Sequence, residues 1–291
     1  MAILIDENTR VIVQGITGTA GRAHTKTMLQ FGTNIVAGVK PGSEGEKVEN
    51  VPVYSTVEEA MREGKANASI IFVPAKFAKA AAIEAINAGI KLLVLPPEHI
   101  PIHDTMYVLE LANRMGTKII GPNTAGIIAP GIRCKIGFVP NKYYIDGHVG
   151  VASRSGTLLY EFGSRLTLEG LGQSTCIGVG GDPIVGTRIG NVLQMFEHDP
   201  KTKVSLIIGE IGGTQEEEVA DLIASGLIKK PVVAYIVGRS VPAGKRMGHA
   251  GAIMYGEKGT MESKIKALSK AGVNIAGTMQ DTVDIVKNLI G

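Results

Sequence analysis

A single histidine, His249, stands among glycines and alanines in the segment Gly244–Ala252, directly after the cations Lys245 and Arg246. Small neighbours leave an imidazole ring accessible and its backbone free to take unusual angles, and the two cations favour an anion beside it. An accessible imidazole can act as a covalent nucleophile. We therefore predict that His249 carries a phosphoryl group. The alternative is a flexible glycine loop in which the histidine has no chemical role.

A carboxylate that can orient this histidine follows a strand expected at residues 204–208. Glu210 lies within Gly209–Gly213, in the same half of the chain as His249. By accepting one ring N–H, a carboxylate fixes the tautomer of an imidazole and raises its nucleophilicity. We predict Glu210 as the catalytic partner of His249. Alternatively, Glu210 is an acid placed just before the helix expected at residues 215–225.

A phosphate site is predicted where Ser153–Thr157 follows a strand and opens a helix. The free amides and the dipole of a helix N-terminus attract anions, so Ser155, Gly156 and Thr157 are predicted to hold phosphate. The segment is not a serine-hydrolase elbow, which requires the spacing G-x-S-x-G. Residues 238–246 resemble a P-loop, but five residues instead of four separate the glycines and an arginine follows the lysine. Neither of these two sites is therefore predicted.

A second anion site is predicted where glycines at positions 15, 18 and 21 follow a strand at residues 10–14 and precede a helix at residues 22–31. The turn offers free amides to a phosphate, but its spacing is G-x-x-G-x-x-G, not the G-x-G-x-x-G of dinucleotide sites. The next strand is followed by Lys40 instead of the acid that binds the ribose of NAD. NAD is therefore disfavoured and coenzyme A is the natural candidate, unless the turn serves only helix–strand packing.

Strands and helices alternate along the whole chain, which predicts an α/β protein with two doubly wound parallel sheets. Pro96 and Pro97 stiffen one strand end of the first sheet, next to Glu98. The predicted boundaries are a first domain at residues 1–122, a turn-rich linker at 123–147 and a second domain at 148–291. The expected elements are strands at 34–39, 68–73, 91–95, 118–120, 149–153, 174–178, 204–208, 232–237 and 273–276, and helices at 75–88, 103–115, 157–169, 187–197, 215–225, 261–271 and 280–289.

Composition narrows the class of protein. A hydrophobic content of 44%, a charged content of 20% and a net charge of +3 are typical of a globular chain, and no dense basic run predicts nucleic-acid binding. No apolar run is long enough to span a membrane, and Asp6 follows too soon for a signal peptide. Cys134 and Cys176 lie far apart without metal-ligand spacing. We expect a cytoplasmic protein with reduced thiols and no metal of its own.

Taken together, these motifs resemble the α subunit of succinyl-CoA synthetase, also called succinate–CoA ligase, in an archaeal-like variant. The resemblance covers essentially the whole chain and rests on several blocks in the same order. These blocks are Gly15–Gly18, Gly121–Asn123, Ser153–Thr157, Gly180–Pro183, Gly209–Gly213 and Gly244–Ala252.

The resemblance implies an N-terminal Rossmann-like domain that binds coenzyme A and a C-terminal flavodoxin-like ligase domain. It implies a partner β subunit with an ATP-grasp fold that binds ATP or GTP with Mg²⁺, in an αβ or α₂β₂ assembly. Residue by residue, it implies that His249 is phosphorylated during turnover, that Glu210 contacts it and that Ser155, Gly156 and Thr157 hold the phosphoryl group. Tyr160 and Asn123 match positions near the acid substrate, and the CoA-binding positions are Thr17, Gly18, Thr19, Ala20, Pro96, Pro97 and Glu98.

The sequence departs from the family at several positions. Ser43 stands where members usually have a CoA-contacting lysine, so Lys40 is the candidate for that phosphate contact. Thr124 stands where bacterial members have cysteine. The implied reaction forms succinyl-CoA from succinate, CoA and a nucleoside triphosphate through phosphohistidine and succinyl phosphate. The alternatives are an α-type subunit that activates citrate or malate by the same chemistry, and a non-catalytic CoA-binding regulator.

Overall fold

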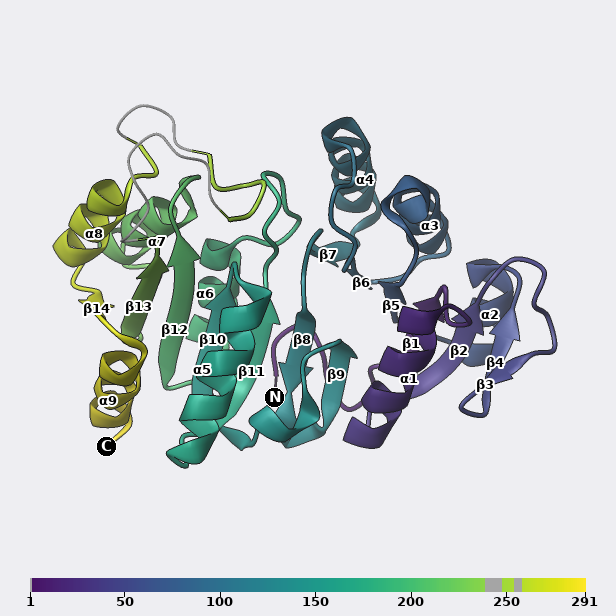
Figure 1. Ribbon diagram of the computed structural model, residues 1–291, viewed down its shortest axis with the longest axis horizontal. Helices are drawn as coiled ribbons and strands as arrows, with labels where there is room; N and C mark the ends of the chain where they lie inside the picture. Colours follow the sequence, from purple (N-terminus) through teal and green to yellow (C-terminus); the bar gives the residue numbers. More distant parts are fainter. Residues whose placement is uncertain (1, 239–247, 254–257) are drawn as a thin grey trace.

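The computed structural model describes residues 2–238, 248–253 and 258–291. These residues form two α/β units that lie side by side, each around its own seven-stranded sheet (Figure 1). The prediction of two doubly wound domains is confirmed.

The first unit has strand order β3-β4-β2-β1-β5-β6-β7, and all neighbouring strands pair in parallel except β3 with β4. Without β3, the order in chain numbering is 3-2-1-4-5-6, which defines a Rossmann-like sheet. Its strands are β1 (Val11–Gln14), β2 (Ile35–Val39), β3 (Lys47–Val48), β4 (Val51–Tyr54), β5 (Ala68–Ile71), β6 (Leu92–Val94) and β7 (Lys118–Ile120), and its helices are α1 (Thr19–Phe31), α2 (Val57–Gly64), α3 (Ala75–Asn87) and α4 (Ile102–Met115).

The second unit has strand order β14-β13-β12-β10-β11-β8-β9. The five parallel strands β10 to β14 follow the order 2-1-3-4-5 of flavodoxin-like folds, in which ligands bind beyond the carboxyl ends of the strands. Its strands are β8 (Gly126–Ala129), β9 (Cys134–Gly137), β10 (Asp146–Ser153), β11 (Gln173–Gly178), β12 (Val204–Glu210), β13 (Val232–Val237) and β14 (Asn274–Ile275). Its helices are α5 (Gly156–Leu168), α6 (Ile189–His198), α7 (Gln215–Ala224), α8 (Met261–Lys270) and α9 (Met279–Ile290), with short 3₁₀ turns η1 (Pro130–Ile132) and η2 (Asn141–Tyr143).

The passage expected as a linker, residues 123–147, contributes β8 and β9 to the edge of the second sheet. The two strands pair with each other in antiparallel fashion, and β8 pairs with β11. Two glycines make the hairpin possible, because a Cβ at Gly126 would lie 2.0 Å from the carbonyl oxygen of Ile136 and a Cβ at Gly137 would lie 2.1 Å from that of Ala125. The boundaries 1–122, 123–147 and 148–291 stay a prediction.

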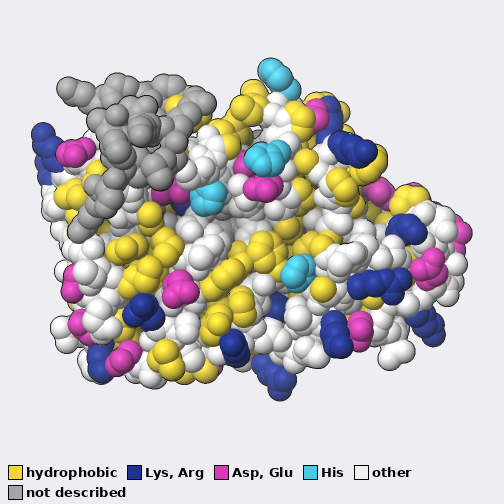
Figure 2. Space-filling view, viewed as in Figure 1, with side chains coloured by type: hydrophobic (Ala, Val, Ile, Leu, Met, Phe, Trp, Pro, Cys, Tyr) yellow, Lys and Arg dark blue, Asp and Glu magenta, His cyan; other side chains and the backbone are white. Residues whose placement is uncertain are grey.

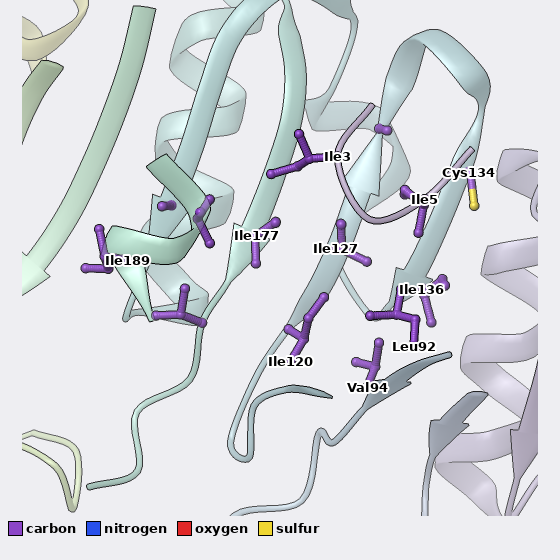
Figure 3. Close-up of a cluster of buried hydrophobic side chains, with 14 of the residues drawn as sticks. Ile3, Ile5, Leu92, Val94, Ile120, Ile127, Cys134, Ile136, Ile177 and Ile189 are labelled. Carbon is purple, nitrogen blue, oxygen red and sulfur yellow. The ribbon is translucent and has the colours of Figure 1, made fainter. Parts of the chain in front are cut away.

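One hydrophobic core joins the two units. The segment that carries Ile3 and Ile5 packs between β6 and β7 of the first sheet and β8, β9 and β11 of the second (Figure 3). Figure 3 labels, besides these two, Leu92, Val94, Ile120, Ile127, Cys134, Ile136, Ile177 and Ile189. Because burial of apolar area is the main stabilising term in folding, this shared core fixes the position of one sheet relative to the other.

A buried lysine adds a polar tie between the units. Lys135 on β9 is fully buried and donates to the carbonyl oxygen of Val139 at 3.0 Å and to the side chain of Asn141. Its backbone exchanges hydrogen bonds of 2.8 and 2.9 Å with the hydroxyl of Thr33, just after α1. Burial lowers the pKa of the Lys135 ammonium to about 8. The helix that opens at the first glycine turn is thus held against the second unit.

Across the described ranges, no helix has the length and apolar character needed to cross a membrane. Both cysteines, Cys134 and Cys176, are free thiols buried in the interior.

Candidate active site

His249 and Glu210 meet at the carboxyl end of the second sheet. Glu210 is the last residue of β12, a strand whose seven residues are all buried, and its Oε2 lies 2.8 Å from Nδ1 of His249. Since a carboxylate only accepts hydrogen bonds, Nδ1 carries a proton, and in the neutral ring the free lone pair lies on Nε2. The hydrogen bond to Glu210 raises the pKa of His249, against the opposing effect of burial. The imidazole remains 29% exposed, while the Glu210 side chain is 11% exposed.

The imidazole packs against the backbone of Gly181. A Cβ at Gly181 would be 2.4 Å from Cγ of His249, so no side chain can stand there while the ring keeps its place. The amide of Gly251 donates to the carbonyl oxygen of Gly181 at 3.0 Å, and the amide of Ala252 donates to that of His249 at 2.9 Å. The Gly180–Pro183 block is therefore needed for close approach between two backbone segments and a ring. Lys245 and Arg246, predicted to favour an anion beside the histidine, lie outside the described residues.

A buried ionic cluster packs against the His249–Glu210 pair on the interior side. The sequence analysis did not predict this cluster. Arg154, Glu216 and Lys264 are nearly or fully buried, and Glu216 pairs with both cations. Lys264 also pairs with Glu217 at 2.9 Å. Among these residues only Arg154 stood in a quoted motif, and no sequence signal linked it to acids 56 to 62 residues away.

The start of α5 lies beside β12, because its preceding strand β10 pairs with β12. Ser155 caps the helix: its Oγ accepts the amide of Leu158 at 3.3 Å, and its own amide donates to Ser153 Oγ at 3.1 Å. The next two amides, of Gly156 and Thr157, belong to the first turn of the helix, where intrahelical acceptors are lacking. The structure therefore brings the predicted phosphate-binding amides to the same sheet edge as His249.

Tyr160 lies on the first turns of α5. Its hydroxyl would be 3.9 Å from a Cβ at Gly156, which places the phenol close to the amides at the helix start. Burial raises the pKa of Tyr160 to about 12. The phenol is thus neutral at ordinary pH and can donate a hydrogen bond to an anion.

Asn123 connects the first domain with Gly181 and Asp182, the segment against which the His249 ring packs. Its amide donates to the carbonyl oxygen of Pro97 at 3.0 Å, its carbonyl oxygen accepts the amide of Gly181 at 3.1 Å, and its side-chain Nδ2 donates to Asp182 Oδ1 at 3.1 Å. Burial raises the pKa of Asp182, and the Asn123 hydrogen bond opposes that shift. One residue thus links the loop that contains Pro96 and Pro97 of the first domain to the Gly181–Asp182 segment beside His249.

On the face shown in Figure 2, histidine and acidic side chains gather where the two domains meet. Glu98, His99 and His249 all act electrostatically on Asp182, and Glu98 Oε1 lies 3.7 Å from Nε2 of His99. Within the described ranges, no group of three or more His, Cys, Asp or Glu is arranged to hold a metal ion.

The first glycine turn lies at the carboxyl end of β1. Gly15 has a left-handed φ of +75°, and a Cβ at Gly21 would lie 2.2 Å from the carbonyl oxygen of Gly15. These two glycines therefore allow α1 to pack directly on the turn. At Gly18, the nearest atom to a Cβ would be 3.4 Å away. Gly18 and the residues that open the helix, Thr19 and Ala20, are exposed at its N-terminus, and Thr17 is half-buried.

The other predicted CoA residues surround the same edge of the sheet. Lys40 follows β2 and is exposed, whereas Pro96 and Pro97 follow β6 and are half-buried. Ser43 is buried, and its hydroxyl has no hydrogen-bond partner among the described residues. A buried serine cannot reach a ligand as an exposed lysine would, so Lys40 remains the predicted phosphate contact.

The geometry defines a two-domain protein with a glycine turn at the end of the first strand of a Rossmann-like sheet and a carboxylate-bound histidine at the edge of a flavodoxin-like sheet. Comparison with known protein families agrees: residues 6–99 match the CoA binding domain and residues 152–274 match the CoA-ligase domain. The chain belongs to the succinate–CoA ligase α subunit family. It is a ligase-family enzyme with a CoA-binding domain, and the designation of its relatives as α subunits implies a partner subunit.

The relatives that show this membership extend over the whole chain. Succinate–CoA ligase, ADP-forming, subunit alpha 1 of Archaeoglobus fulgidus is 50% identical over 290 residues, which cover 100% of this chain and 99% of the relative. The corresponding subunit of Methanothermobacter thermautotrophicus is 52% identical over 289 residues, which cover 99% and 97%. A subunit from Staphylococcus epidermidis is 51% identical over 278 residues, which cover 96% and 91%.

Solved structures share the fold. An ATP citrate lyase of Methanosaeta concilii in complex with (3S)-citryl-CoA superposes with a TM-score of 0.89 at 26% identity, covering 99% of this chain. This chain spans 50% of the length of that lyase chain. A dinucleotide-forming acetyl-coenzyme A synthetase of Ca. Korarchaeum cryptofilum has a TM-score of 0.80 at 21% identity, covering 97% of this chain and 61% of its own. The second comparison shows the common fold alone.

Proposed function

We propose that this chain is the α subunit of a succinate–CoA ligase that forms succinyl-CoA from succinate, CoA and ATP together with a β subunit. The observation that carries the proposal is the 2.8 Å contact between Nδ1 of His249 and Glu210, which leaves Nε2 as a nucleophile. Relatives at 50% to 52% identity are named as ADP-forming succinate–CoA ligase α subunits, which favours succinate and ATP. An ATP-grasp fold for the β subunit is part of this proposal.

The reaction divides into three displacements. Nε2 of His249 attacks the terminal phosphorus of the nucleotide, forms an N–P bond and releases the nucleoside diphosphate. A carboxylate oxygen of succinate then attacks this phosphorus, which breaks the N–P bond and gives succinyl phosphate. Finally, the thiol of CoA loses its proton and attacks the acyl carbon, which releases inorganic phosphate and gives the thioester.

The chain's own residues have distinct roles in these steps. Glu210 holds the imidazole in the Nδ1–H tautomer and stabilises the positive charge that develops on the ring. The amides of Gly156 and Thr157, after the cap residue Ser155, bind the phosphoryl oxygens at the helix N-terminus. Tyr160, as a neutral phenol, donates a hydrogen bond to the acid substrate.

Coenzyme A is proposed to occupy the turn of the first domain. Thr17, Gly18, Thr19 and Ala20 present amides and hydroxyls to its phosphates, and Lys40 supplies a cation. Pro96, Pro97 and Glu98 line the neighbouring strand end. Asn123 is proposed to contact the acid substrate, and because its hydrogen bond to Asp182 uses only one of the two Nδ2 hydrogens, it can do so without losing that bond. Because both of its cysteines are free and buried, we place the protein in the reducing cytoplasm.

A citrate ligase is the second candidate, favoured by the fold shared with ATP citrate lyase. Thr124 does not support it, because its hydroxyl already donates to the carbonyl oxygen of Gly178 and accepts the amide of Gly126 at 2.9 Å. Initial rates of the reconstituted pair on succinate, citrate and malate separate the candidates. A clear preference for citrate or malate would overturn the choice of substrate.

The phosphohistidine is tested directly by labelling. We expect the αβ pair, incubated with γ-labelled ATP, to give acid-labile and base-stable phosphate on this chain, which His249→Asn abolishes. His103→Asn, at an exposed histidine of α4, is the matched control and keeps the label. A wild-type pair without label would instead support a non-catalytic CoA-binding regulator. Label retained in His249→Asn would place the nucleophile elsewhere.

A further inference from the structure

The guanidinium of Arg154 is buried beneath the histidine, with 3% of its side chain exposed. Nη1 donates to the carbonyl oxygen of Gly212 at 2.7 Å and, at 3.3 Å, to that of Glu210 and to Glu216 Oε1. Nη2 donates to the carbonyl oxygen of Gly251 at 3.3 Å and lies 3.1 Å from Glu210 Oε1. Its partners are the residues that flank, orient or support His249.

Arg154 therefore joins the two segments whose separation sets the histidine geometry. One is the end of β12, which carries the orienting carboxylate. The other is the segment 248–253, which carries the imidazole and whose Gly251 carbonyl oxygen accepts from the guanidinium. A planar fork of donors can hold a carboxylate and several carbonyl oxygens at once, which a lysine ammonium cannot reproduce.

The position of the Arg154 guanidinium is itself fixed by the buried Glu216–Lys264 pair. Glu216 Oε1 accepts from Arg154 and from the backbone amide of Glu210 at 3.1 Å, while its Oε2 accepts from Lys264. Lys264 is fully buried and also donates to the carbonyl oxygen of Gly213 at 2.9 Å. The Arg154 fork thus rests on a carboxylate with no exposed surface.

We propose that Arg154 is the positioning residue of the phosphohistidine site: it holds the Glu210 carboxylate and the Gly251 carbonyl so that Nε2 of His249 faces the incoming phosphorus. This role rests on the proposed function of His249. The Arg154 charge also acts on the ring through space, because it lowers the pKa of His249 while Glu210 and Asp182 raise it. The cation thus favours the neutral imidazole that attacks phosphorus.

The test compares Arg154→Met and Arg154→Lys with a matched surface variant. Arg188→Met removes an arginine that forms a two-point pair with Glu218, at 2.6 and 2.9 Å, in a partly exposed position of the same domain. Each chain is reconstituted with the β subunit, and the single-turnover rate of His249 labelling by γ-labelled ATP is measured. CoA affinity by calorimetry, the KM for ATP and the pKa of His249 by NMR are measured in parallel.

We expect labelling to slow by about 100-fold in Arg154→Met, because a misplacement of about 1 Å has that effect on an oriented reaction. Arg154→Lys recovers only part of the rate. CoA affinity and the KM for ATP stay within about twofold, since only the alignment step is affected. The pKa of His249 rises in Arg154→Met, and added guanidinium ion restores part of its labelling rate. Arg188→Met labels at the wild-type rate.

A folded Arg154→Met protein that labels at the wild-type rate would overturn the role. So would a loss of labelling matched by an equal loss of CoA affinity, which indicates general damage to the fold. If Arg154→Met does not fold, Arg154→Lys decides: a wild-type rate and an unchanged pKa of His249 contradict the proposal. Absence of label in the wild-type pair would instead remove the proposed function on which the role rests.

Discussion

The glycine turn after β1 and the segment that carries His249 at the end of β12 are both proposed to receive phosphate, but they are built by different means. The turn at Gly15–Gly21 offers backbone amides, and its geometry depends on two close backbone approaches, of Gly21 to the carbonyl oxygen of Gly15 and of Gly15 to that of Phe72. His249 depends on four charged side chains from separate elements, Arg154, Glu210, Glu216 and Lys264. A site that only binds a ligand can be made from backbone groups, whereas a nucleophile that must be oriented requires fixed charges around it.

This difference predicts that the second site is the more sensitive to a single buried substitution. Glu216→Leu leaves the cations of Arg154 and Lys264 buried without their shared partner. Breaking a buried ion pair in this way lowers the free energy of unfolding by about 3–5 kcal/mol. Urea unfolding at neutral pH measures the loss.

Two further variants show whether the loss comes from unpaired charge. Glu216→Leu combined with Lys264→Met also removes one of the two buried cations that share Glu216, so we expect part of the stability to return. Glu218→Leu breaks the partly exposed pair with Arg188 and changes stability by no more than about 1 kcal/mol. Equal effects of Glu216→Leu and Glu218→Leu would contradict the distinction between the buried cluster and the surface pair.

The second prediction concerns Gly181, against which the imidazole of His249 packs. Gly181→Ala adds a methyl group that would lie 2.4 Å from Cγ of His249. Because this distance is too short for non-bonded atoms, the ring must move from its position at the sheet edge. We expect His249 labelling by ATP to slow by about 100-fold, with CoA affinity unchanged. Gly190→Ala is the control, because its methyl group meets only the end of the Leu222 side chain. Rapid-quench labelling separates the two variants.

The sequence predicted most of the helices and strands, and it predicted that His249, Glu210 and the start of α5 meet at one sheet edge. The strand at 232–237 and the helices near 75–88, 103–115 and 157–169 agree with the structure to within a residue or two. Long segments with a clear periodicity of hydrophobic residues can be assigned from sequence, because burial of one face or of both faces dictates where the apolar residues fall. The short pieces β3, β4 and α2 were not predicted, although the capping box of Thr56 and Glu59 marks the start of α2.

The sequence predicted only those residues of the candidate site that lie in recognisable motifs. His249, Glu210 and the α5 start stood in glycine-rich blocks, and the structure brings them to one sheet edge. The support beneath them could not be predicted, since Glu216 and Lys264 read as ordinary charges on helices until the fold buries them together. Asn123 was predicted as a substrate residue, yet its hydrogen bonds to Pro97, Gly181 and Asp182 become visible only when the two domains are placed.

The third prediction addresses the other region. Gly21→Ala brings a methyl group to 2.2 Å from the carbonyl oxygen of Gly15, whereas the nearest atom to a Cβ at Gly18 is 3.4 Å away. We expect Gly21→Ala to weaken CoA binding by about 10-fold, or 1.4 kcal/mol, and Gly18→Ala to weaken it less. Calorimetry with CoA measures both. His249 labelling by ATP should continue in both variants, and its loss in Gly21→Ala would show that the two sites are not separable.

The smallest expected effect is a shift in pH dependence, which tests how His249 depends on its charged neighbours. The hydrogen bond from Nδ1 to Glu210 raises the pKa of His249 above its ordinary value of 6.5, with Asp182 acting in the same direction and Arg154 in the opposite one. Attack on phosphorus needs Nε2 without its proton. The rate of labelling should therefore rise with pH through this raised pKa, and in Glu210→Gln the midpoint should move down towards 6.5.

Stability should follow the opposite trend. A raised folded-state pKa means that the folded chain holds the proton more tightly than the unfolded chain, so the His249–Glu210 pair contributes fully below pH 6.5. That contribution is lost as the pH rises through the folded-state pKa, and Glu210→Gln should abolish this part of the pH dependence. Labelling rates and urea midpoints measured across about pH 5.5 to 9 test both trends, with Glu218→Gln as control. A labelling midpoint that does not move in Glu210→Gln would show that the carboxylate does not control the protonation of the nucleophile.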